Sequence, residues 1–311
     1  GIRHRPGHRP GGPAARIGQV RTRIVILRRQ SQAETIVRRY GTEGQALFAM
    51  SRSPEGARAF SRAKLYESAE ARGLRLIREA IPDGVKTVEI DRSLVAQFLF
   101  EPFDLVVALG QDGLVANVGK YLDGQPLAGV NPDPANIEGA LLPFNIEAFV
   151  KALPDAIGDA RPAREATLAE VATSDRQTLY GLNEIFVGVP THQSARYRIA
   201  SGKKAEEHSS SGLIVATGTG SSGWLKSLKG EAAAFDPSED RLRFVVREAW
   251  PGRGFGAALT EGDVTAKHPL VIESRMEGVI FADGIEADAI RFDAGVIATI
   301  RPAARKVRLI R

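Results

Sequence analysis

The stretch FDLVVALGQDGLVANVGKYLDGQPLAGVN, residues 103–131, has two apolar runs separated by a glycine-rich loop and a helical segment. Its pattern predicts a strand over Leu105–Leu109, a helix from about Leu114 to Leu122 and a second strand over Leu127–Val130. A strand, a helix and a strand in this order form a βαβ unit with parallel strands. The stretch therefore indicates an α/β domain with a parallel, Rossmann-like sheet, in which ligands bind at the carboxyl ends of the strands.

The segments before this unit continue the alternation of strands and helices. RIVILRR, from Arg23, is a short β-rich run, and VKTVEI, Val85–Ile90, alternates as a strand does. Between them, Ser31 and Glu34 fit a capping box, in which each side chain bonds the backbone N–H of the other residue. A helical pattern follows from Ala59 to Ile81. The first half of the chain is thus expected to form one α/β domain.

The second half of the chain changes to short alternating segments separated by Gly, Asp and Pro turns, which is typical of an antiparallel β domain. The segments are TLYGLNEIFVGV, ARYRIA, LIVAT, RLRFVV, PLVIES, GVIFADGI, GVIATI and KVRLI. We expect a boundary near Arg161, so that residues 21–160 form the α/β domain and residues 161–311 a mainly antiparallel β domain. The last strand is a candidate to return to the first domain.

Composition excludes several kinds of site. The chain has no cysteine, so disulfides, thiolate zinc sites, iron–sulfur clusters and cysteine nucleophiles are excluded. No apolar run reaches the roughly 18 residues of a membrane-spanning helix. Eight arginines precede the first acidic residue, Glu34, so the rest of the chain is mildly acidic despite the net charge of +5. We expect residues 1–20 to be a disordered basic tail, and neither a membrane nor a nucleic acid as partner.

Gly218, Gly220 and Gly223 have the G-x-G-x-x-G spacing of a dinucleotide-binding fingerprint. That fingerprint ends the first strand of a βαβ unit, and an acid closes the second strand about 20 residues later. Here the glycines lie within β-rich sequence, and Asp240 precedes the run RLRFVV instead of ending it. A Walker phosphate loop does not fit, since Trp224 stands where the motif has lysine. A glycine-rich turn between strands explains the spacing equally well.

Three distant segments are more specific when they are taken together. They are LGQDG at Leu109–Gly113, LNEIFVG at Leu182–Gly188 and SSGLIVATGTGSSGW at Ser210–Trp224. In order and spacing they resemble the NAD kinase family, whose hallmarks are a GGDG loop, an Asn-Glu pair and a loop of the form T-P-T-G-S-T-A-Y. RRYGTEGQALF, GVNPDP and RFVVREAW look like the divergent branch that contains the mitochondrial NAD kinases of animals and related bacterial proteins. The resemblance covers the whole folded part of the chain.

The resemblance implies a kinase that transfers phosphate from ATP, with Mg²⁺ held mainly by phosphates, to the 2′-hydroxyl of the adenosine ribose of NAD(H). Asp112 would be the catalytic base, and Asn183 and Glu184 would bind the hydroxyls of a NAD ribose. Other substrate- and nucleotide-binding residues would be Gly110, Gly113, Thr217, Thr219, Gly220, Ser222, Gly223, Trp224 and Ser227. Without the resemblance, Asp112 would be expected to bond its own turn, and Trp224 to belong to the core.

Several positions depart from the family pattern. Gln111 replaces the second glycine of GGDG, so this position cannot take a conformation open only to glycine without strain. Gly218 stands for proline, Ser222 for threonine, and Ser211 for the aspartate of the main branch. The choices between NAD⁺ and NADH and between ATP and polyphosphate stay open. Gln111 adds the alternative that catalysis is slow or lost.

Two further functions stay open at this point. One is a related GGDG-type kinase for a lipid or a sugar, against which the Asn-Glu pair and the Thr-Gly loop argue. The other is a catalytically inactive dinucleotide-binding module. The resemblance also implies a homodimer or higher homo-oligomer, cytoplasmic in a bacterium, and it allows a mitochondrial location in a eukaryote. The histidines show no metal-site spacing, and we expect His192, His208 and His268 at the surface.

Overall fold

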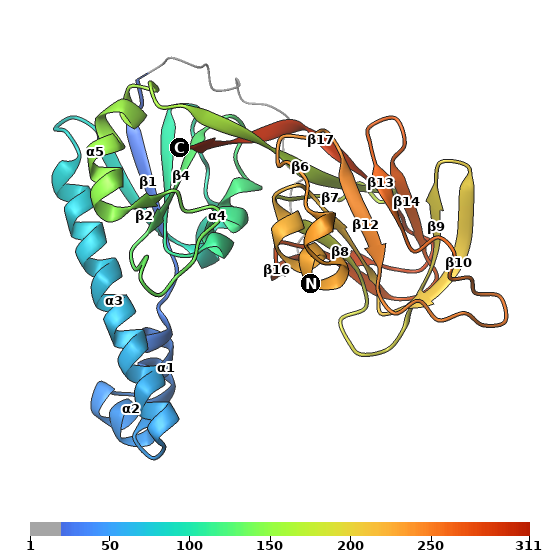
Figure 1. Cartoon of the computed structure of the whole chain (residues 1–311), viewed down its shortest axis with the longest axis horizontal. Coiled ribbons are helices and arrows are strands. Elements are labelled where there is room, and N and C mark those ends of the chain that lie inside the picture. The colour runs from blue at the N-terminus through green and yellow to red at the C-terminus, as the bar shows by residue number, and fades with distance from the viewer. Residues whose placement is uncertain (1–19) are drawn as a thin grey trace. The chain divides into compact units, whose positions relative to one another are not determined.

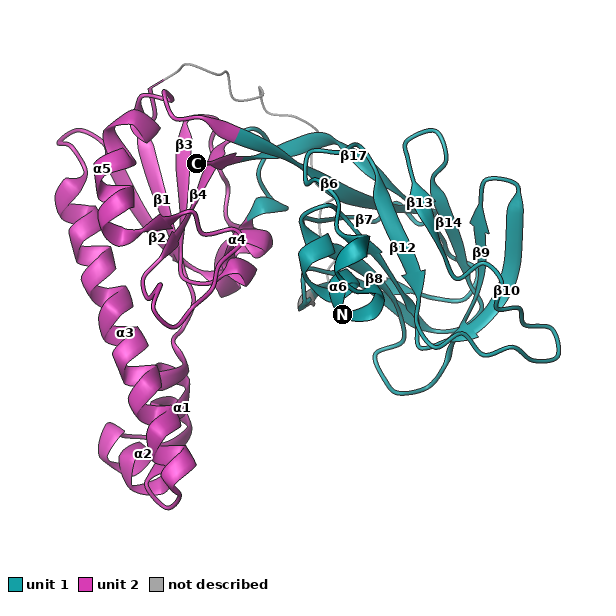
Figure 2. Cartoon of the chain, in the orientation of Figure 1, with its two compact units in different colours: residues 1–14, 119–124, 164–308 teal, residues 15–118, 125–163, 309–311 magenta. Residues whose placement is uncertain are grey.

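The computed structural model describes residues 20–311, and the side chains of residues 286 and 287 are left out. The expected basic tail therefore lies outside the described residues, apart from Val20. The chain divides into two compact units (Figure 2). One, the parallel unit, comprises residues 20–118, 125–163 and 309–311; the other, the antiparallel unit, comprises residues 119–124 and 164–308. Within residues 20–311, the chain crosses between the units four times.

The strands of the parallel unit pair in parallel, in the order β2–β1–β3–β4–β5. They are part of an 11-stranded sheet in which β17 also pairs with β4. Its strands are β1 (Arg23–Arg28), β2 (Lys86–Asp91), β3 (Asp104–Leu109), β4 (Pro126–Asn131) and β5 (Phe144–Asn145). Its helices are α1 (Gln32–Tyr40), α2 (Glu43–Met50), α3 (Pro54–Ala80), α4 (Asp112–Gly119) and α5 (Ile146–Ile157), and a 3₁₀ turn spans Arg92–Gln97 (Figure 1). The predicted parallel α/β domain is confirmed.

The sequence explains why these elements form. β3 and β4 are buried at every position, as expected for parallel strands with both faces covered. On one face, Ile24 and Leu105 pack with Leu74 of α3 and Phe149 of α5. The capping box of α1 is confirmed, because the Ser31 hydroxyl accepts the Glu34 N–H and the Glu34 carboxylate accepts the Ser31 N–H.

Two expected helices have different limits. The helix expected over Ala59–Ile81 begins earlier, since Ser53 caps it and Pro54 occupies its first turn, a position where proline loses no hydrogen bond. The helix expected from about Leu114 is α4, which begins at Asp112 and ends at Gly119.

The antiparallel unit has two layers of strands. One layer is a sheet in the order β13–β12–β11–β8–β15–β16, antiparallel throughout. The other contains β10–β9–β14–β17, with β6 beside β17 and β7 beside β6. The core between the layers contains Val187, Val215 and Phe244 from the first sheet and Ile199 and Ile272 from the second. The expected antiparallel β domain is therefore present as a sandwich.

The strands of the antiparallel unit are β6 (Ala163–Thr173), β7 (Thr178–Gly181), β8 (Glu184–Gly188), β9 (Ala195–Ser201), β10 (Lys204–Ser210), β11 (Leu213–Ala216), β12 (Leu242–Val246), β13 (Glu261–Val264), β14 (Leu270–Ser274), β15 (Gly278–Ala282), β16 (Ile285–Phe292) and β17 (Ile297–Ile310). Helix α6 (Trp224–Lys229) and 3₁₀ turns at Gly220–Ser222 and Glu231–Ala233 follow β11. The segments GVIATI and KVRLI belong to the single strand β17, which continues through Pro302.

Candidate functional site

The parallel sheet places the Gly110–Gly113 loop at a position that favours ligand binding. The order β2–β1–β3–β4–β5 has its topological switch point between β1 and β3, and open α/β sheets bind ligands outside the carboxyl ends of the strands at such a point. Gly110 follows directly on the carboxyl end of β3, and its N–H donates to the Val130 carbonyl of β4. The loop thus begins at the edge of the sheet where a ligand is expected.

Asp112 is the first residue of α4 and is partly exposed. Its two carboxylate oxygens accept the N–H groups of Ala140 and Leu141, each at 2.9 Å, so it pins the loop that follows β4. Without the resemblance, Asp112 was expected to bond its own turn, whereas its carboxylate bonds a loop about 28 residues away in the chain. A carboxylate has about four acceptor positions, so Asp112 retains capacity for a ligand proton.

Gln111 introduces no backbone strain. Among residues 20–311, the residues other than glycine that have positive φ are Asp159, Arg176, Glu248 and Asp283, and Gln111 is not one of them. Gln111 is exposed, and its carbonyl accepts the Leu114 N–H at 2.8 Å. The position therefore does not need the conformational freedom of glycine.

In the antiparallel unit, the Asn183–Glu184 turn and the loop after β11 are in direct contact. The Thr217 N–H donates to the Asn183 carbonyl at 2.9 Å, and the Thr217 hydroxyl donates to the Leu182 carbonyl. The same hydroxyl accepts the Gly220 N–H at 3.1 Å. Thr217 is fully buried, so its hydroxyl joins the two segments from within. Asn183 and Glu184 are partly exposed.

Asp283, between β15 and β16, holds the other side of this turn. Its carboxylate accepts the N–H groups of Leu182, Asn183 and Glu184 at 2.9, 2.7 and 3.3 Å. The Asp283 N–H donates to the Glu184 carbonyl at 3.1 Å. Asp283 was not among the site residues predicted from the sequence. The Ala-Asp-Gly hairpin was a usable signal, because aspartate and glycine tolerate the positive φ that such turns need.

The carboxyl group of Glu184 has a raised pKa. Burial, and then the nearby carboxylate of Asp283, raise the pKa of Glu184 to about 8. Burial also raises the pKa of Asp283 to about 6, against the lowering effects of Lys120 and of the three N–H groups. The two carboxyl groups therefore oppose each other's ionisation, and Asp283 is the more acidic of the pair.

The glycines of the G-x-G-x-x-G stretch have a packing role. A Cβ at Gly218 would lie 2.2 Å from the Asp236 carbonyl oxygen, and a Cβ at Gly220 would lie 2.0 Å from that of Asn183. Gly223 is open, with its nearest atom, the Gly220 carbonyl oxygen, at 3.5 Å. The first two glycines therefore let the loop approach the backbone of this chain, as a glycine-rich turn does.

The remaining residues of this loop differ in accessibility. Ser222 and Ser227 are exposed, and each hydroxyl donates to a carbonyl three residues earlier, at 3.1 and 2.7 Å. Thr219 is 6% exposed, and within the described residues its hydroxyl has no hydrogen-bond partner. Trp224 is half-buried and stacks on Phe186 with ring centroids 5.9 Å apart. One side of the indole is thus used in packing.

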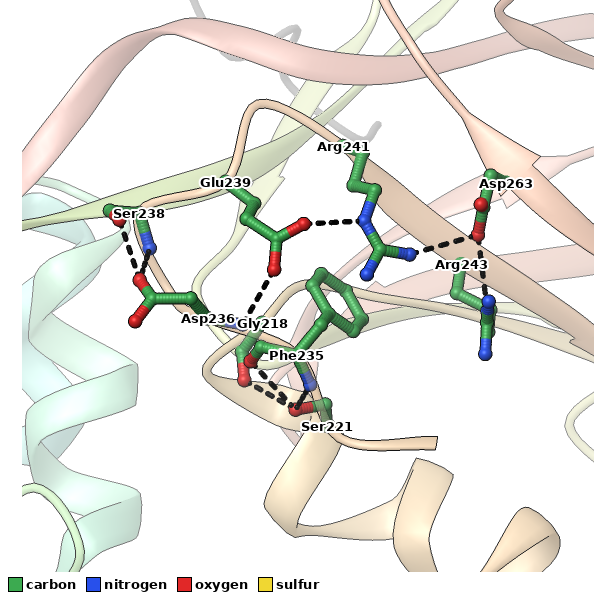
Figure 3. A network of polar contacts seen from close by, with 9 residues as sticks. All are labelled: Gly218, Ser221, Phe235, Asp236, Ser238, Glu239, Arg241, Arg243 and Asp263. Carbon is green, nitrogen blue, oxygen red and sulfur yellow. Dashed lines mark hydrogen bonds and ion pairs between the residues drawn. The ribbon is translucent and has the colours of Figure 1, made fainter. Parts of the chain in front are cut away.

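A network of polar contacts holds the loop in place (Figure 3). The buried hydroxyl of Ser221 donates to the Gly218 carbonyl at 2.6 Å and accepts the Phe235 N–H at 3.1 Å. The Arg241 guanidinium lies 4.1 Å from the Phe235 ring centroid and bonds Asp263 at 3.1 Å. Asp263 in turn accepts from Arg243, and Arg241 also bonds Glu239. The loop is therefore fixed to the β12–β13 hairpin.

The structure corrects one expectation about the histidines. His192 and His268 are exposed, but His208 on β10 is fully buried. Its Nε2 lies 2.6 Å from Glu206 Oε2, and β10 pairs it with Tyr197 of β9. The run KAEEHSS is too polar to suggest a strand, but it forms β10, whose last three residues are buried. The described residues contain no group of three or more metal-binding side chains.

The predicted site residues thus form two groups. Gly110, Asp112 and Gly113 belong to the parallel unit, whereas the Asn-Glu pair and the Thr217–Ser227 segment belong to the antiparallel unit. Within each group the residues are neighbours. Within the described residues, no helix is both long and apolar enough to cross a membrane.

Solved structures of NAD kinases have a similar fold. The chain superposes on the crystal structure of an NAD kinase from Archaeoglobus fulgidus in complex with ATP with a TM-score of 0.57 and 18% identity, over 93% of each chain. It superposes on yeast NADH kinase complexed with NADH with a TM-score of 0.62 and 14% identity, over 94% of this chain and 84% of the yeast chain. No protein-family model matches the sequence, and no curated protein does. At these identities the similarity establishes the fold.

Proposed function

We propose that this protein is an NAD kinase, which transfers the γ-phosphoryl group of ATP to the 2′-hydroxyl of the adenosine ribose of NAD(H). The observation that carries the proposal is the contact between the Asn183–Glu184 turn and the Thr217–Gly223 loop. Both segments carry the residues that resemble the NAD kinase family, and both lie in a fold similar to that of the archaeal and yeast enzymes.

The chemistry of these two segments suits a ribose. A carboxyl group beside an amide can accept from and donate to a pair of neighbouring hydroxyls, and Asn183 and Glu184 are both accessible. The unpaired buried hydroxyl of Thr219 offers a further hydrogen bond, because a buried polar group without a partner is costly until a ligand satisfies it. Gly223, Trp224 and the neighbouring serines would complete the dinucleotide site.

In the proposed reaction, Asp112 accepts the proton of the 2′-hydroxyl as its oxygen bonds the γ-phosphorus of ATP. The bond between that phosphorus and the β,γ-bridging oxygen breaks, and ADP leaves. Asp112 has the required acceptor capacity at the switch point of the sheet, where Gly110 and Gly113 would adjoin the phosphates. Such a base contributes about 10²–10⁴-fold to the rate.

Mg²⁺ fits this proposal as an ion held mainly by the phosphates of ATP, where it neutralises their charge. Mg²⁺ typically keeps several waters and needs only one or two protein carboxylates. The described residues accordingly need no preformed cluster of acidic ligands.

The test is to incubate the purified protein with ATP, Mg²⁺ and either NAD⁺ or NADH, and to measure the product with an NADP-specific dehydrogenase. Diacylglycerol and a hexose serve as competing acceptors with labelled ATP. We expect label on the dinucleotide alone. Label on lipid or sugar but not on dinucleotide would contradict the proposal in favour of a related kinase.

A second outcome would also contradict the proposal. If NAD(H) binds but is never phosphorylated, the protein is an inactive dinucleotide-binding module. The Gln111→Gly variant then tests the cause, because recovery of turnover in this variant would assign the loss to Gln111. If the wild type is active, as we expect, Gln111→Gly should change its turnover less than tenfold, since the backbone of Gln111 is unstrained.

A further inference from the structure

A cluster of buried charged groups lies behind the Asn183–Glu184 turn. Lys120 is 2% exposed, and its ammonium group bonds Asp288 of β16 at 2.7 Å and the Ala282 carbonyl at 3.3 Å. The Tyr121 hydroxyl also donates to Asp288. Asp283 follows Ala282 directly, and Lys120 is close enough to act electrostatically on the carboxylate that holds the turn.

The backbone conformation of Asp283 determines what its carboxylate contacts. Its φ of 55° is left-handed, a conformation that costs most residues free energy but that Asp and Asn tolerate. This turn aims one carboxylate at three consecutive N–H groups, those of Leu182, Asn183 and Glu184. Fixing three successive amides fixes the backbone from which the side chains of Asn183 and Glu184 project.

We propose that Asp283 is a positioning residue for the ribose-binding pair Asn183–Glu184, and that its carboxylate, held next to this pair and to Lys120, makes the binding of a ligand diol depend on pH. The inference rests on the proposed function to the extent that the diol is a ribose of NAD(H). The link between Asp283 and the ionisation of Glu184 does not depend on the ligand.

Electrostatics supports this role. The pKa of Glu184 is raised to about 8, first by burial and then by Asp283. Burial raises the pKa of Asp283 to about 6, and Lys120 opposes that rise, so that Lys120 favours the charge on Asp283 that opposes a second charge on Glu184. Asp288 and Tyr121 bond each other beside Lys120, and Arg305 of β17 bonds the Lys120 carbonyl at 2.7 Å. Of the charged and titratable groups, Lys120 thus acts directly on the pair, and Asp288, Tyr121 and Arg305 are linked to it through Lys120.

The test is the pH profile of NADH affinity, measured by NADH fluorescence from pH 6 to 9.5 in the wild type and in Asp283→Asn. Asparagine keeps the size and left-handed tolerance of aspartate but loses the charge and one acceptor oxygen. We expect at least a tenfold loss of affinity at pH 9. We also expect the rise of affinity with pH, centred near 8 in the wild type, to move down by about one pH unit.

Asp293→Asn is the matched control. Asp293 follows the other end of β16 and its carboxylate is 46% exposed, so neither the affinity nor the profile should change. A purely structural role for Asp283 would lower affinity equally at every pH. Unchanged affinity, or an unshifted profile, in Asp283→Asn would overturn the proposal.

If the wild type does not bind NADH, the proposed function fails and the electrostatic part is tested without ligand. The difference in unfolding free energy between the wild type and Glu184→Gln, followed against pH, reports the ionisation of Glu184. When Asp283→Asn is present in both proteins, this difference in unfolding free energy should begin to change at a lower pH. An identical pH dependence in the two backgrounds would overturn the inference.

Discussion

At the scale of single residues, the raised pKa of Glu184 predicts how the unfolding free energy depends on pH. Its pKa is about 8 in the folded protein and about 4.3 for an unfolded glutamate. The folded state therefore binds more protons, so the wild type loses stability as pH rises from about 4 to 8. Glu184→Gln removes this loss. We expect the variant to gain, relative to the wild type, on the order of 3 kcal/mol of unfolding free energy between pH 5 and pH 9.

Urea denaturation at the two pH values measures this difference. The exposed Glu165 of β6 provides the control Glu165→Gln, which should show no comparable change with pH. A constant difference between Glu184→Gln and the wild type would mean that Glu184 ionises normally.

NADH binding should also respond to Glu184→Gln more at pH 9 than at pH 7, because only the ionised carboxylate accepts both ribose hydroxyls.

Asp112 combines a structural and a proposed chemical role, and the two can be separated. Asp112→Asn keeps one oxygen for the N–H groups of Ala140 and Leu141 and should lower the unfolding free energy by about 1 kcal/mol. If Asp112 is also the base, turnover should fall by about 10²–10⁴-fold with NADH affinity retained. Calorimetric stability and NADPH formation are measured on the same samples. Near-normal turnover in a measurably destabilised variant would leave Asp112 only its structural role.

At the scale of elements, the Thr217–Gly223 loop contains a matched pair of glycines. Gly220→Ala places a methyl group 2.0 Å from the Asn183 carbonyl oxygen, whereas Gly223→Ala meets nothing closer than 3.5 Å. We expect Gly220→Ala to cost about 1–3 kcal/mol or more and to displace the Asn183–Glu184 turn, which would weaken NADH binding at least tenfold. Gly223→Ala should be nearly neutral in stability. Equal stability and affinity of both variants would show that the loop can move away from the turn.

The elements differ in how well the sequence predicts them. The strands and helices of the parallel unit follow from their apolar runs and from local signals such as Ser31 and Glu34, since the forces that form them act over a few residues. β10 was not predicted, because charged residues occupy the strand that contains the buried His208. The contact of Asp283 with Asn183 joins residues 100 positions apart, and no local pattern encodes such a pairing.

The candidate site was predictable only in part for the same reason. The motif residues could be identified from their resemblance to a family, but their contacts could not. Thr217, for example, is expected to bind nucleotide, but the bonds of its buried hydroxyl to Leu182 and Gly220 could not be read from the motif. The proton on Glu184 depends on the burial that folding creates, so its pKa shift has no counterpart in the sequence.

At the scale of the whole molecule, the parallel unit is not one continuous segment of chain. Residues 309–311 belong to it after the long excursion of residues 164–308 into the antiparallel unit. Ile310 is 3% exposed in the same core cluster as Ile24 and Leu105. The Arg311 N–H donates to the Pro162 carbonyl at 3.0 Å. The last residues of the chain are thus part of the core and backbone bonding of its first domain.

This connectivity predicts that a substitution next to the chain end destabilises the parallel unit. Ile310→Ala should cost about 2–5 kcal/mol, as truncation of a buried aliphatic side chain does. Ile297→Ala, at the other end of β17 where the side chain is 40% exposed, should cost much less.

Both tryptophans, Trp224 and Trp250, lie in the antiparallel unit, so their fluorescence does not report the parallel unit directly. Hydrogen exchange of the β1 and β3 amides during urea titration is therefore the measurement, and faster exchange there in Ile310→Ala than in Ile297→Ala is the expected result. Equal protection in the two variants would show that the chain end is dispensable for the parallel unit.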